Sequence, residues 1–478
     1  MGRLKRRLQI GGHMHSELFR VGCGAGFGGD RIDAAVPVVS ALVASGGPAC
    51  LMFETLAERT LALSQLARRE GGVGYDLHLI DRLRPILGAC LQHKISIVGN
   101  FGAADPVGAA KAIDALAREL GVRAPKIFIV IGDDLMANPH RAEIDQTLQD
   151  CLPEGALPLS ANVYLGAAEI CDALHAGADI VVTGRVADPA LALGAVAAHF
   201  DWSFDDYNLI AAGTMAGHLL ECGGQVTGGY FADPGMKNVP DLANLGFPIV
   251  EISGDGAMVV TKPEGTGGCV TARTVKEQLL YEIHDPAAYL TPDVVLDLTG
   301  VSVEDLGQDR VALRGARGTK RPETLKATVC YDGGFIGEGG ISYSGPGAEK
   351  RARLAIDILR ARLAPDLEMQ ARTVSTQAQM STLFEGGPER LIATSPAGSY
   401  NLTEIAEIQN DVRVHVAVRS NDKADVERAM HEIGALYTCG PGGGGGVRST
   451  IRSRVYTSSA LIPRNLVVAS CQKWSDAK

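Results

Sequence analysis

The residues of this chain best suited to chemistry are carboxylates that directly follow apolar runs. Glu54 follows the run 50–53, and the adjacent Asp133 and Asp134 follow the run 127–131. Two carboxylates held close together cannot both ionise easily, so such a pair suits metal binding or a shifted pKa, and a shifted carboxyl group can transfer protons. The structural alternative for the aspartates is that one caps the next helix and the other faces water.

Two arginines could hold the acid group of a substrate. Arg31 follows Asp30 at the end of a glycine-rich loop, and Arg185 lies just after the apolar run 180–183. A guanidinium binds a carboxylate or phosphate through two parallel hydrogen bonds, while a neighbouring acid such as Asp30 could transfer protons. Asp30 could equally cap a helix whose first turn holds a solvated Arg31. We favour the binding role for Arg185, because an arginine at a strand end is badly placed for mere solubility.

A third group of reactive side chains lies in one short segment bounded by glycines. If this segment is helical, His218 and Cys222 are one turn apart and Glu221 is three residues from His218, so one helix face could hold all three. They could then supply a general base or a nucleophile. The alternative is a buried thiol beside a capping glutamate.

The glycines after the first apolar run have the spacing Gly24-x-Gly26-x-x-Gly29, and Glu54 ends the second run. This matches the outline of a dinucleotide fingerprint, in which glycines let the backbone approach a pyrophosphate and an acid holds the ribose. Asp30, however, would repel a phosphate at that place. We therefore favour a loop that approaches a different substrate, keep a structural turn as the alternative, and disfavour NAD.

Amides and Asp-Pro pairs also occur where apolar runs end. Asn100 and Asn162 could orient a polar substrate, or they could satisfy loop backbone. Asp105 and Asp188 each precede a proline, so both are expected to be helix N-caps with proline at the first helical position.

All these residues need a scaffold in which strand ends meet. From residue 21 to 201, short β-branched runs alternate with alanine-rich segments of helical period. Apolar runs without polar alternation are typical of strands buried on both faces, so the sequence predicts a parallel α/β domain, either doubly wound or barrel-like. Ligands gather at the carboxyl ends of the strands in both architectures. The predicted strands are 19–22, 50–53, 95–98, 127–131, 159–164 and 180–183.

The whole chain is expected to divide into three domains after a leader. Residues 1–20 could be a disordered leader, and residues 21–205 form the parallel α/β domain. Residues 206–365 read as a mixed α+β domain, and residues 366–478 as a small α+β unit for which a ferredoxin-like fold is one option.

Composition excludes several classes of protein. Hydrophobic residues make up 46% of the 478 positions and charged residues 21%, which is too apolar for a disordered chain. A net charge of −10 with scattered lysines and arginines argues against nucleic-acid binding. Apolar stretches stay shorter than the roughly 18 residues of a membrane span. Ten cysteines without a CxxC pair fit the cytoplasm, and glycine-rich edges lead us to expect a homo-oligomer.

A family resemblance rests on segments that occur in a fixed order: GCGAGFGGDRIDAA, FETLAERTLAL, GNFGAADP, GDDL, ADIVVTGRVADPALALG, GHLLECGGQVTGG and GTGGCVTARTVKEQLLYEIHDPAAYLTPDV. Over roughly residues 20–365 the chain resembles the acyclic terpene utilisation protein A (AtuA-like) family. That family is named for bacterial growth on citronellol and geraniol, whose pathways use branched acyl-CoA intermediates. The resemblance therefore implies catabolism of small carboxylic acids or their CoA esters. Larger members carry, or pair with, a ferredoxin-like unit, which residues 410–470 match loosely.

The main hypothesis is a cytoplasmic catabolic enzyme of the lyase or hydratase type that acts by proton transfer on a small carboxylate or acyl-CoA. Arg31 and Arg185 would hold the acid group, and the loop 22–29 would approach the substrate. Alanine at Arg185 is expected to lower turnover sharply without unfolding the protein. The candidates for proton transfer are Asp30, Glu54, Asp133 and Glu221, and those for substrate binding are Gly24, Gly26, Gly29, Arg31, Asn100 and Arg185.

Two other functions are compatible with the sequence. One is a nicotinamide-dependent oxidoreductase that uses the glycine loop and Glu54. The other is a non-catalytic subunit that completes the active site of a partner. The sequence identifies no cofactor, although its paired carboxylates leave a divalent metal open.

Overall fold

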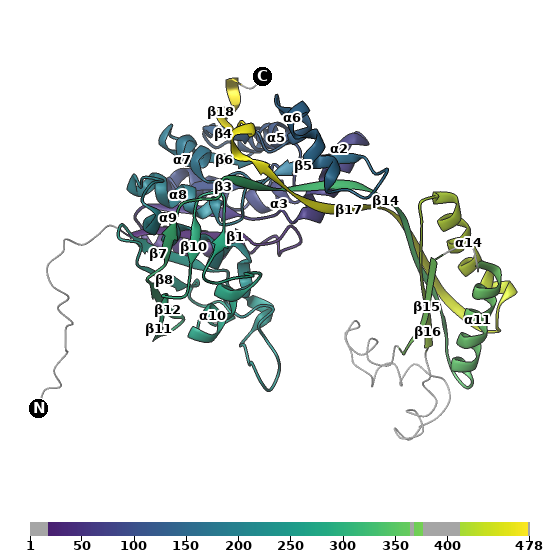
Figure 1. Ribbon diagram of the computed structural model, residues 1–478. Coiled ribbons are helices and arrows are strands. Elements are labelled where there is room, and N and C mark those ends of the chain that lie inside the picture. Colours follow the sequence, from purple (N-terminus) through teal and green to yellow (C-terminus); the bar gives the residue numbers. More distant parts are fainter. Residues whose placement is uncertain (1–17, 364–367, 376–411, 477–478) are drawn as a thin grey trace, which may run out of the picture. The chain divides into compact units, whose positions relative to one another are not determined.

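The computed structural model describes residues 18–363, 368–375 and 412–476, and it divides into two compact units (Figure 1). One unit contains the chain up to Tyr331 together with Thr457–Lys478, and the other contains Asp332–Tyr456. The chain passes between the units within two long strands, β14 (Thr324–Tyr343) and β17 (Gly444–Pro463). No described helix is both long and apolar enough to cross a membrane.

The first unit is built on a ten-stranded sheet with five parallel strands at its centre. All residues of two central strands are buried, which explains why apolar runs without alternation mark them in the sequence. The predicted parallel α/β fold is confirmed. In spatial order the central strands are β1 (Leu18–Ala25), β2 (Ala49–Phe53), β3 (Ser96–Gly99), β6 (Ile180–Thr183) and β4 (Ile127–Ile131). Residues 18–20 of the proposed leader thus belong to β1, and its residues 1–17 lie outside the described residues.

Antiparallel strands continue the sheet on both sides of this centre. Because β7 pairs with β1, the segment after residue 205 extends the same sheet and packs within the same unit, where the sequence suggested a separate domain. The sheet has two free ends in its strand order, so it is open and not a barrel. The added strands are β7 (Ile249–Ser253), β8 (Met258–Thr261), β12 (Arg310–Arg314) and β11 (Ser302–Gly307) on one side, and β18 (Ser470–Lys473) on the other.

One predicted strand lies outside the main sheet. β5 (Pro158–Val163) pairs antiparallel with β14, with Val163 opposite Ala327. The expectation that this run joins the parallel strands is wrong, because the free edge of β4 is covered by β18, which comes from the end of the chain. Pairings this distant in sequence leave no trace in the local pattern of β5.

Helices pack on both faces of the main sheet and connect its parallel strands. These helices form two groups, one on each face of the sheet. The first group contacts β1, β3 and β4, and the second group contacts β1, β2, β3 and β4. The first group includes α1 (Ala35–Ser45), α4 (Leu87–His93) and α5 (Pro106–Glu119); the second includes α7 (Ala168–His175), α8 (Ala190–Phe200) and α9 (Tyr207–Glu221). The last of these ends beside the glycine loop that follows β1, and so brings residues from beyond position 205 to the carboxyl ends of the strands.

The second unit has its own sheet and core. Its described elements follow the order β–α–β–β–α–β, with the strand order β15-β16-β14-β17, which is the arrangement of ferredoxin-like folds. This unit begins at Asp332, before the predicted boundary at residue 366, and residues from Thr457 onward belong to the first unit. Besides the two long strands its elements are α11 (Ala348–Leu363), β15 (Glu368–Ser375), β16 (Val412–Ser420) and α14 (Lys423–Cys439).

Candidate active site

The strand order of the main sheet places several sequence candidates side by side at one edge. The loops after β1, β2, β3, β6 and β4 carry, in that order, Gly26, Glu54, Asn100, Arg185 and Asp133. A parallel sheet brings all these loops to the carboxyl edge of the strands. A cavity of about 770 Å³ opens there, and Glu54, Arg185, His218, Glu221 and Cys222 are among the residues that line it.

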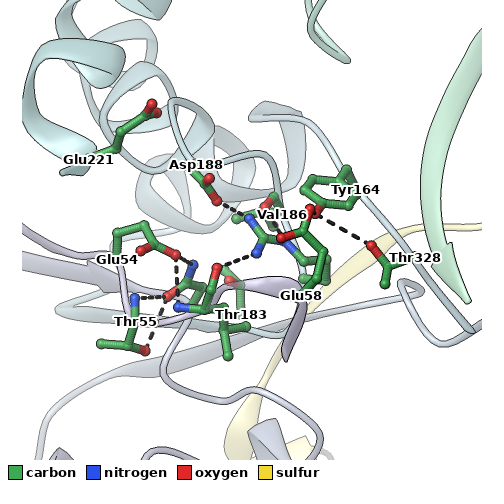
Figure 2. A network of polar contacts seen from close by, with 12 residues as sticks. Glu54, Thr55, Glu58, Tyr164, Thr183, Val186, Asp188, Glu221 and Thr328 are labelled. Carbon is green, nitrogen blue, oxygen red and sulfur yellow. Dashed lines mark hydrogen bonds and ion pairs between the residues drawn. The ribbon is translucent and has the colours of Figure 1, made fainter. Parts of the chain in front are cut away.

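Glu54 is a buried carboxyl group with one oxygen held by the protein. Its Oε1 accepts hydrogen bonds from the Asn100 amide, at 2.8 Å, and from the backbone N–H of Leu56, at 2.8 Å (Figure 2). Burial raises the pKa of Glu54 to about 7, with the charge of Glu221 adding to the rise and Arg185 opposing it. Both bonds end on the same oxygen, so Oε2 can exchange a proton near neutral pH.

Asn100 positions Glu54 and also satisfies loop backbone. Its side chain is fully buried, and its Oδ1 accepts from the backbone N–H of Thr55 at 2.7 Å while its Nδ2 donates to Glu54. Both polar ends of the amide are therefore used by the protein. Of the two roles considered for Asn100, the structure shows the backbone contact, and it adds the hold on Glu54.

His218 and Glu221 form a buried pair on α9. The segment is helical, as the spacing argument required, and His218 Nδ1 lies 2.7 Å from Glu221 Oε1. Burial lowers the pKa of His218, but the carboxylate of Glu221 outweighs this and raises it overall. The second polar atom of each side chain, Nε2 of His218 and Oε2 of Glu221, is buried without a hydrogen-bond partner. Unpaired buried polar atoms beside a cavity are places where a ligand can bind.

Cys222 follows this pair but is poorly suited to act as a nucleophile. Burial raises the pKa of its thiol to about 12, and the charge of Glu221 adds to the rise. The reactive form of cysteine is the thiolate, which such an environment suppresses. The carboxyl and imidazole groups are therefore the better candidates for chemistry on this segment.

Arg185 is almost fully buried, with 1% of its surface exposed. Its guanidinium donates to the backbone carbonyls of Leu56 and Val186 and to the carboxylate of Asp188 (Figure 2). The guanidinium carbon also lies 4.3 Å from the centre of the Tyr164 ring, a cation–π contact. Each of the three guanidinium nitrogens thus donates a hydrogen bond to a group of the protein.

Asp188 does not have the capping role expected for it. Helix α8 begins at Ala190 with Pro189 as its N-cap, and the Asp188 side chain pairs with Arg185 instead. That prediction is wrong because the buried guanidinium competes successfully for the carboxylate. Asp105 does cap α5, accepting from the backbone N–H of Gly108 at 2.9 Å.

Sequence reasoning missed the polar group at the rim of the cavity. The Tyr164 hydroxyl donates to Glu58 at 2.7 Å, and Lys326 Nζ lies 3.1 Å from the same oxygen. Burial raises the pKa of Glu58, but the hydrogen bond from Tyr164 and the charge of Lys326 outweigh it and lower the pKa to about 2. Lys326 belongs to β14, and its approach could not be inferred from local sequence.

The glycine loop packs closely against the end of α9. A Cβ atom on Gly26 would lie 2.0 Å from the backbone nitrogen of Gly223, so a side chain does not fit there. The N–H of Gly26 donates to Asp30 at 2.8 Å, and α1 begins only at Ala35. Gly26 is therefore required for close packing of the loop against α9. Its backbone N–H, which could otherwise bind a pyrophosphate, already donates to the Asp30 carboxylate. Gly24 has the same reason for being small, since its Cβ would meet the Phe53 ring.

Six of the predicted residues are not among those that line this cavity: Gly24, Gly29, Asp30, Arg31, Asn100 and Asp133. Arg31 is exposed and donates to the backbone carbonyls of Leu242 and Ala243, which fixes a loop. Asp30 and Gly29 belong to the same turn and are not among the cavity-lining residues. Burial raises the pKa of Asp30, although the bond from Gly26 opposes the rise.

Asp133 lines a separate pocket of about 430 Å³. Its Oδ2 accepts from Asn162 Nδ2 at 2.8 Å and from the backbone N–H of Arg185 at 2.9 Å, and burial raises its pKa to about 6. Asp134 accepts from the backbone N–H of Met136 and so caps a short 3-10 helix. Within the described part of the chain, no group of three or more His, Cys, Asp or Glu side chains is arranged to hold a metal.

The raised pKa of Glu54 predicts an unusual pH dependence of stability. Between about pH 4.5 and 7 the folded protein keeps a proton that the unfolded chain releases, so this group lowers the free energy of unfolding by about 3 kcal/mol as the pH rises through that window. Glu54→Gln cannot ionise and should remove this fall. Urea unfolding at a series of pH values measures the effect, with the exposed Glu154→Gln as the matched control. Parallel curves for the wild-type protein and Glu54→Gln would contradict the prediction.

Comparison with known proteins identifies a family that matches nearly the whole chain. A family model described as "Acyclic terpene utilisation family protein AtuA" matches residues 19–472. Comparison with curated proteins gives no significant match. Among solved structures, a hydantoinase/carbamoylase family amidase from Burkholderia ambifaria aligns at 15% identity with a TM-score of 0.15, over 28% of this chain and 30% of that chain. An alignment at that TM-score carries no argument about fold or function.

Proposed function

The chain belongs to the acyclic terpene utilisation family AtuA, and from that premise we propose that it is a catabolic enzyme of the lyase or hydratase type, moving protons on a small carboxylic acid or its CoA ester. The observation that carries the proposal is one cavity containing two carboxyl groups in different settings. Glu54 is buried with a raised pKa, and Glu221 is paired with His218. Pairs of titratable groups whose environments differ in this way support acid–base assignments.

The proposed chemistry needs one group to remove a proton and another to return one. Glu221 is the candidate base, because its Oε1 lies 2.7 Å from His218 Nδ1 while its Oε2 has no hydrogen-bond partner beside the cavity. Glu54 is the candidate acid, because its raised pKa leaves a substantial protonated fraction near neutral pH. In a dehydration, the base would take the proton beside the carbonyl group and the acid would protonate the departing hydroxyl, so that water leaves as a neutral molecule.

The remaining candidates support this pair in the proposal. Asn100 holds Glu54, and Asp30 holds the glycine loop against α9 through Gly26. Asp133 accepts from the backbone of Arg185 and so fixes the loop after β6. The loop geometry around Gly26 does not favour a nicotinamide cofactor. The paired, partly unsatisfied groups in the cavity favour an enzyme over a non-catalytic subunit.

Isotope exchange tests the proposed reaction directly. The protein is incubated in D2O with 2-butenoyl-CoA, 3-hydroxybutanoyl-CoA and the two free acids, and NMR follows deuterium at C2 and the interconversion of hydroxy and unsaturated forms. We expect enzyme-dependent exchange at C2 with at least one of these compounds. Absence of both exchange and interconversion over the whole panel would count against a lyase or hydratase and favour the subunit alternative.

A further inference from the structure

We propose that the cavity admits the neutral carbonyl end of its substrate, as a thioester, ester or amide, and rejects a free carboxylate. This inference rests on the proposed function and narrows its substrate class. It comes from the pairing of charges in the cavity wall, which the sequence did not suggest. It differs from the sequence-based expectation that Arg185 binds the carboxylate group of the substrate.

Carboxylates outnumber cations among the residues that line the cavity. Each basic side chain in the cavity wall already contacts a carboxylate: Arg185 contacts Asp188, Lys326 contacts Glu58, and His218 contacts Glu221. Two further carboxyl groups, Glu54 and Glu282, remain after these pairs are counted. The cavity-lining acids are Glu54, Glu58, Asp188, Glu221 and Glu282, and the basic side chains are Arg185, Lys326 and His218.

Arg185 is almost fully buried, and its guanidinium is hydrogen-bonded to the protein. Its guanidinium donates to the Leu56 and Val186 carbonyls and to Asp188, and the Tyr164 ring lies against it. A substrate carboxylate that bound the guanidinium through Nη2 would compete for it with Asp188. Such an exchange replaces one carboxylate by another and leaves the first without its partner, so it offers no net attraction.

Lys326 is similarly engaged at the rim of the cavity. Its Nζ lies 3.1 Å from Glu58 Oε1 and 5.0 Å from the centre of the Tyr164 ring. An entering carboxylate would have to share the lysine with Glu58. Bringing an anion into a site with a surplus of acids costs both desolvation and repulsion.

The hydrogen-bond donors that remain suit a neutral oxygen. The phenol of Tyr289 lines the cavity, and burial raises its pKa, so it stays protonated. Protonated Glu54 is a second neutral donor. Neutral donors are matched to a carbonyl oxygen, whereas a full negative charge is better bound by charged donors.

The test compares one acyl group in two charge states. Ligand-detected NMR at neutral pH measures binding of 2-butenoate and of its neutral thioester with N-acetylcysteamine. We expect the thioester to bind at least about tenfold more tightly than the acid. Equal or tighter binding of 2-butenoate would overturn the inference, and so would the failure of both compounds to bind.

A variant that removes a carboxylate from the cavity wall tests the same inference, because it should raise the affinity for the free acid. Glu58→Gln keeps an acceptor for Tyr164 but frees Lys326, so affinity for 2-butenoate should rise about three- to fivefold while thioester affinity stays unchanged. Glu323→Gln frees Lys320 outside the cavity and should change neither affinity. No gain for the acid in Glu58→Gln would contradict the role given to this ion pair.

The outcomes separate this inference from the proposed function. If the protein exchanges the C2 proton of free 3-hydroxybutanoate as readily as that of 3-hydroxybutanoyl-CoA, the reaction stands and the charge preference falls. If the thioester binds selectively but no exchange occurs, the charge preference stands and the proposed reaction falls.

Discussion

Glu54→Gln is expected to lower the rate of C2 proton exchange by about 10²–10⁴-fold and to leave the fold intact. Glutamine has the same shape, and its amide oxygen can accept the two bonds that Asn100 and the Leu56 N–H now donate to Oε1. The group that disappears is the titrating Oε2 side of the carboxyl. The loss should therefore fall on the proton-transfer step and leave binding of the N-acetylcysteamine thioester within a few fold of wild type.

The control for this result is Glu154→Gln, which makes the same chemical change at an exposed position away from the cavity. Circular dichroism and urea unfolding establish that both variants are folded. Exchange at the wild-type rate in folded Glu54→Gln would remove Glu54 from the mechanism. Loss of thioester binding together with exchange would instead assign Glu54 to substrate binding.

The parallel half of the fold could be predicted because its signal is local. Strands β2 and β6 are buried along their whole length, so each is a continuous apolar run that turns abruptly into polar residues. β5 shows the limit of this reasoning, since it is equally regular but pairs with β14, more than a hundred residues later. The place of β7 in this sheet was equally unpredictable, because its partner β1 lies far earlier in the chain, with Leu18 opposite Ser253.

The site could be predicted in part for the same reason. Glu54, Asn100 and Arg185 end neighbouring parallel strands, so knowing the fold class suffices to bring them together. The helical spacing of His218 and Glu221 was also readable, but their approach to Glu54 depends on α9 crossing back to the glycine loop. Arg31 shows the converse case: it follows the same loop but turns outward to the carbonyls of Leu242 and Ala243.

Side-chain partners were the least predictable feature, and they change the meaning of two residues. Asp188 precedes a proline just before α8, as an N-cap aspartate often does, yet its carboxylate pairs with the buried guanidinium of Arg185. Arg185 has the sequence of a ligand-binding arginine, yet its donors point into the protein. A local motif states what a side chain could contact, whereas the packed core decides which of those contacts forms.

Arg185→Ala is accordingly expected to destabilise the protein by about 3–5 kcal/mol, contrary to the sequence-based expectation of a folded variant with impaired turnover. The substitution removes the partner of Asp188, leaves the Leu56 and Val186 carbonyls without their donors, and opens a void beneath the Tyr164 ring. Urea unfolding of the variant measures the loss. Arg84→Ala provides the matched control, because its ion pair with Glu119 is exposed to solvent and its removal should change the stability far less than Arg185→Ala. If Arg185→Ala unfolds at the same urea concentration as Arg84→Ala and loses only activity, the guanidinium serves the substrate and not the fold.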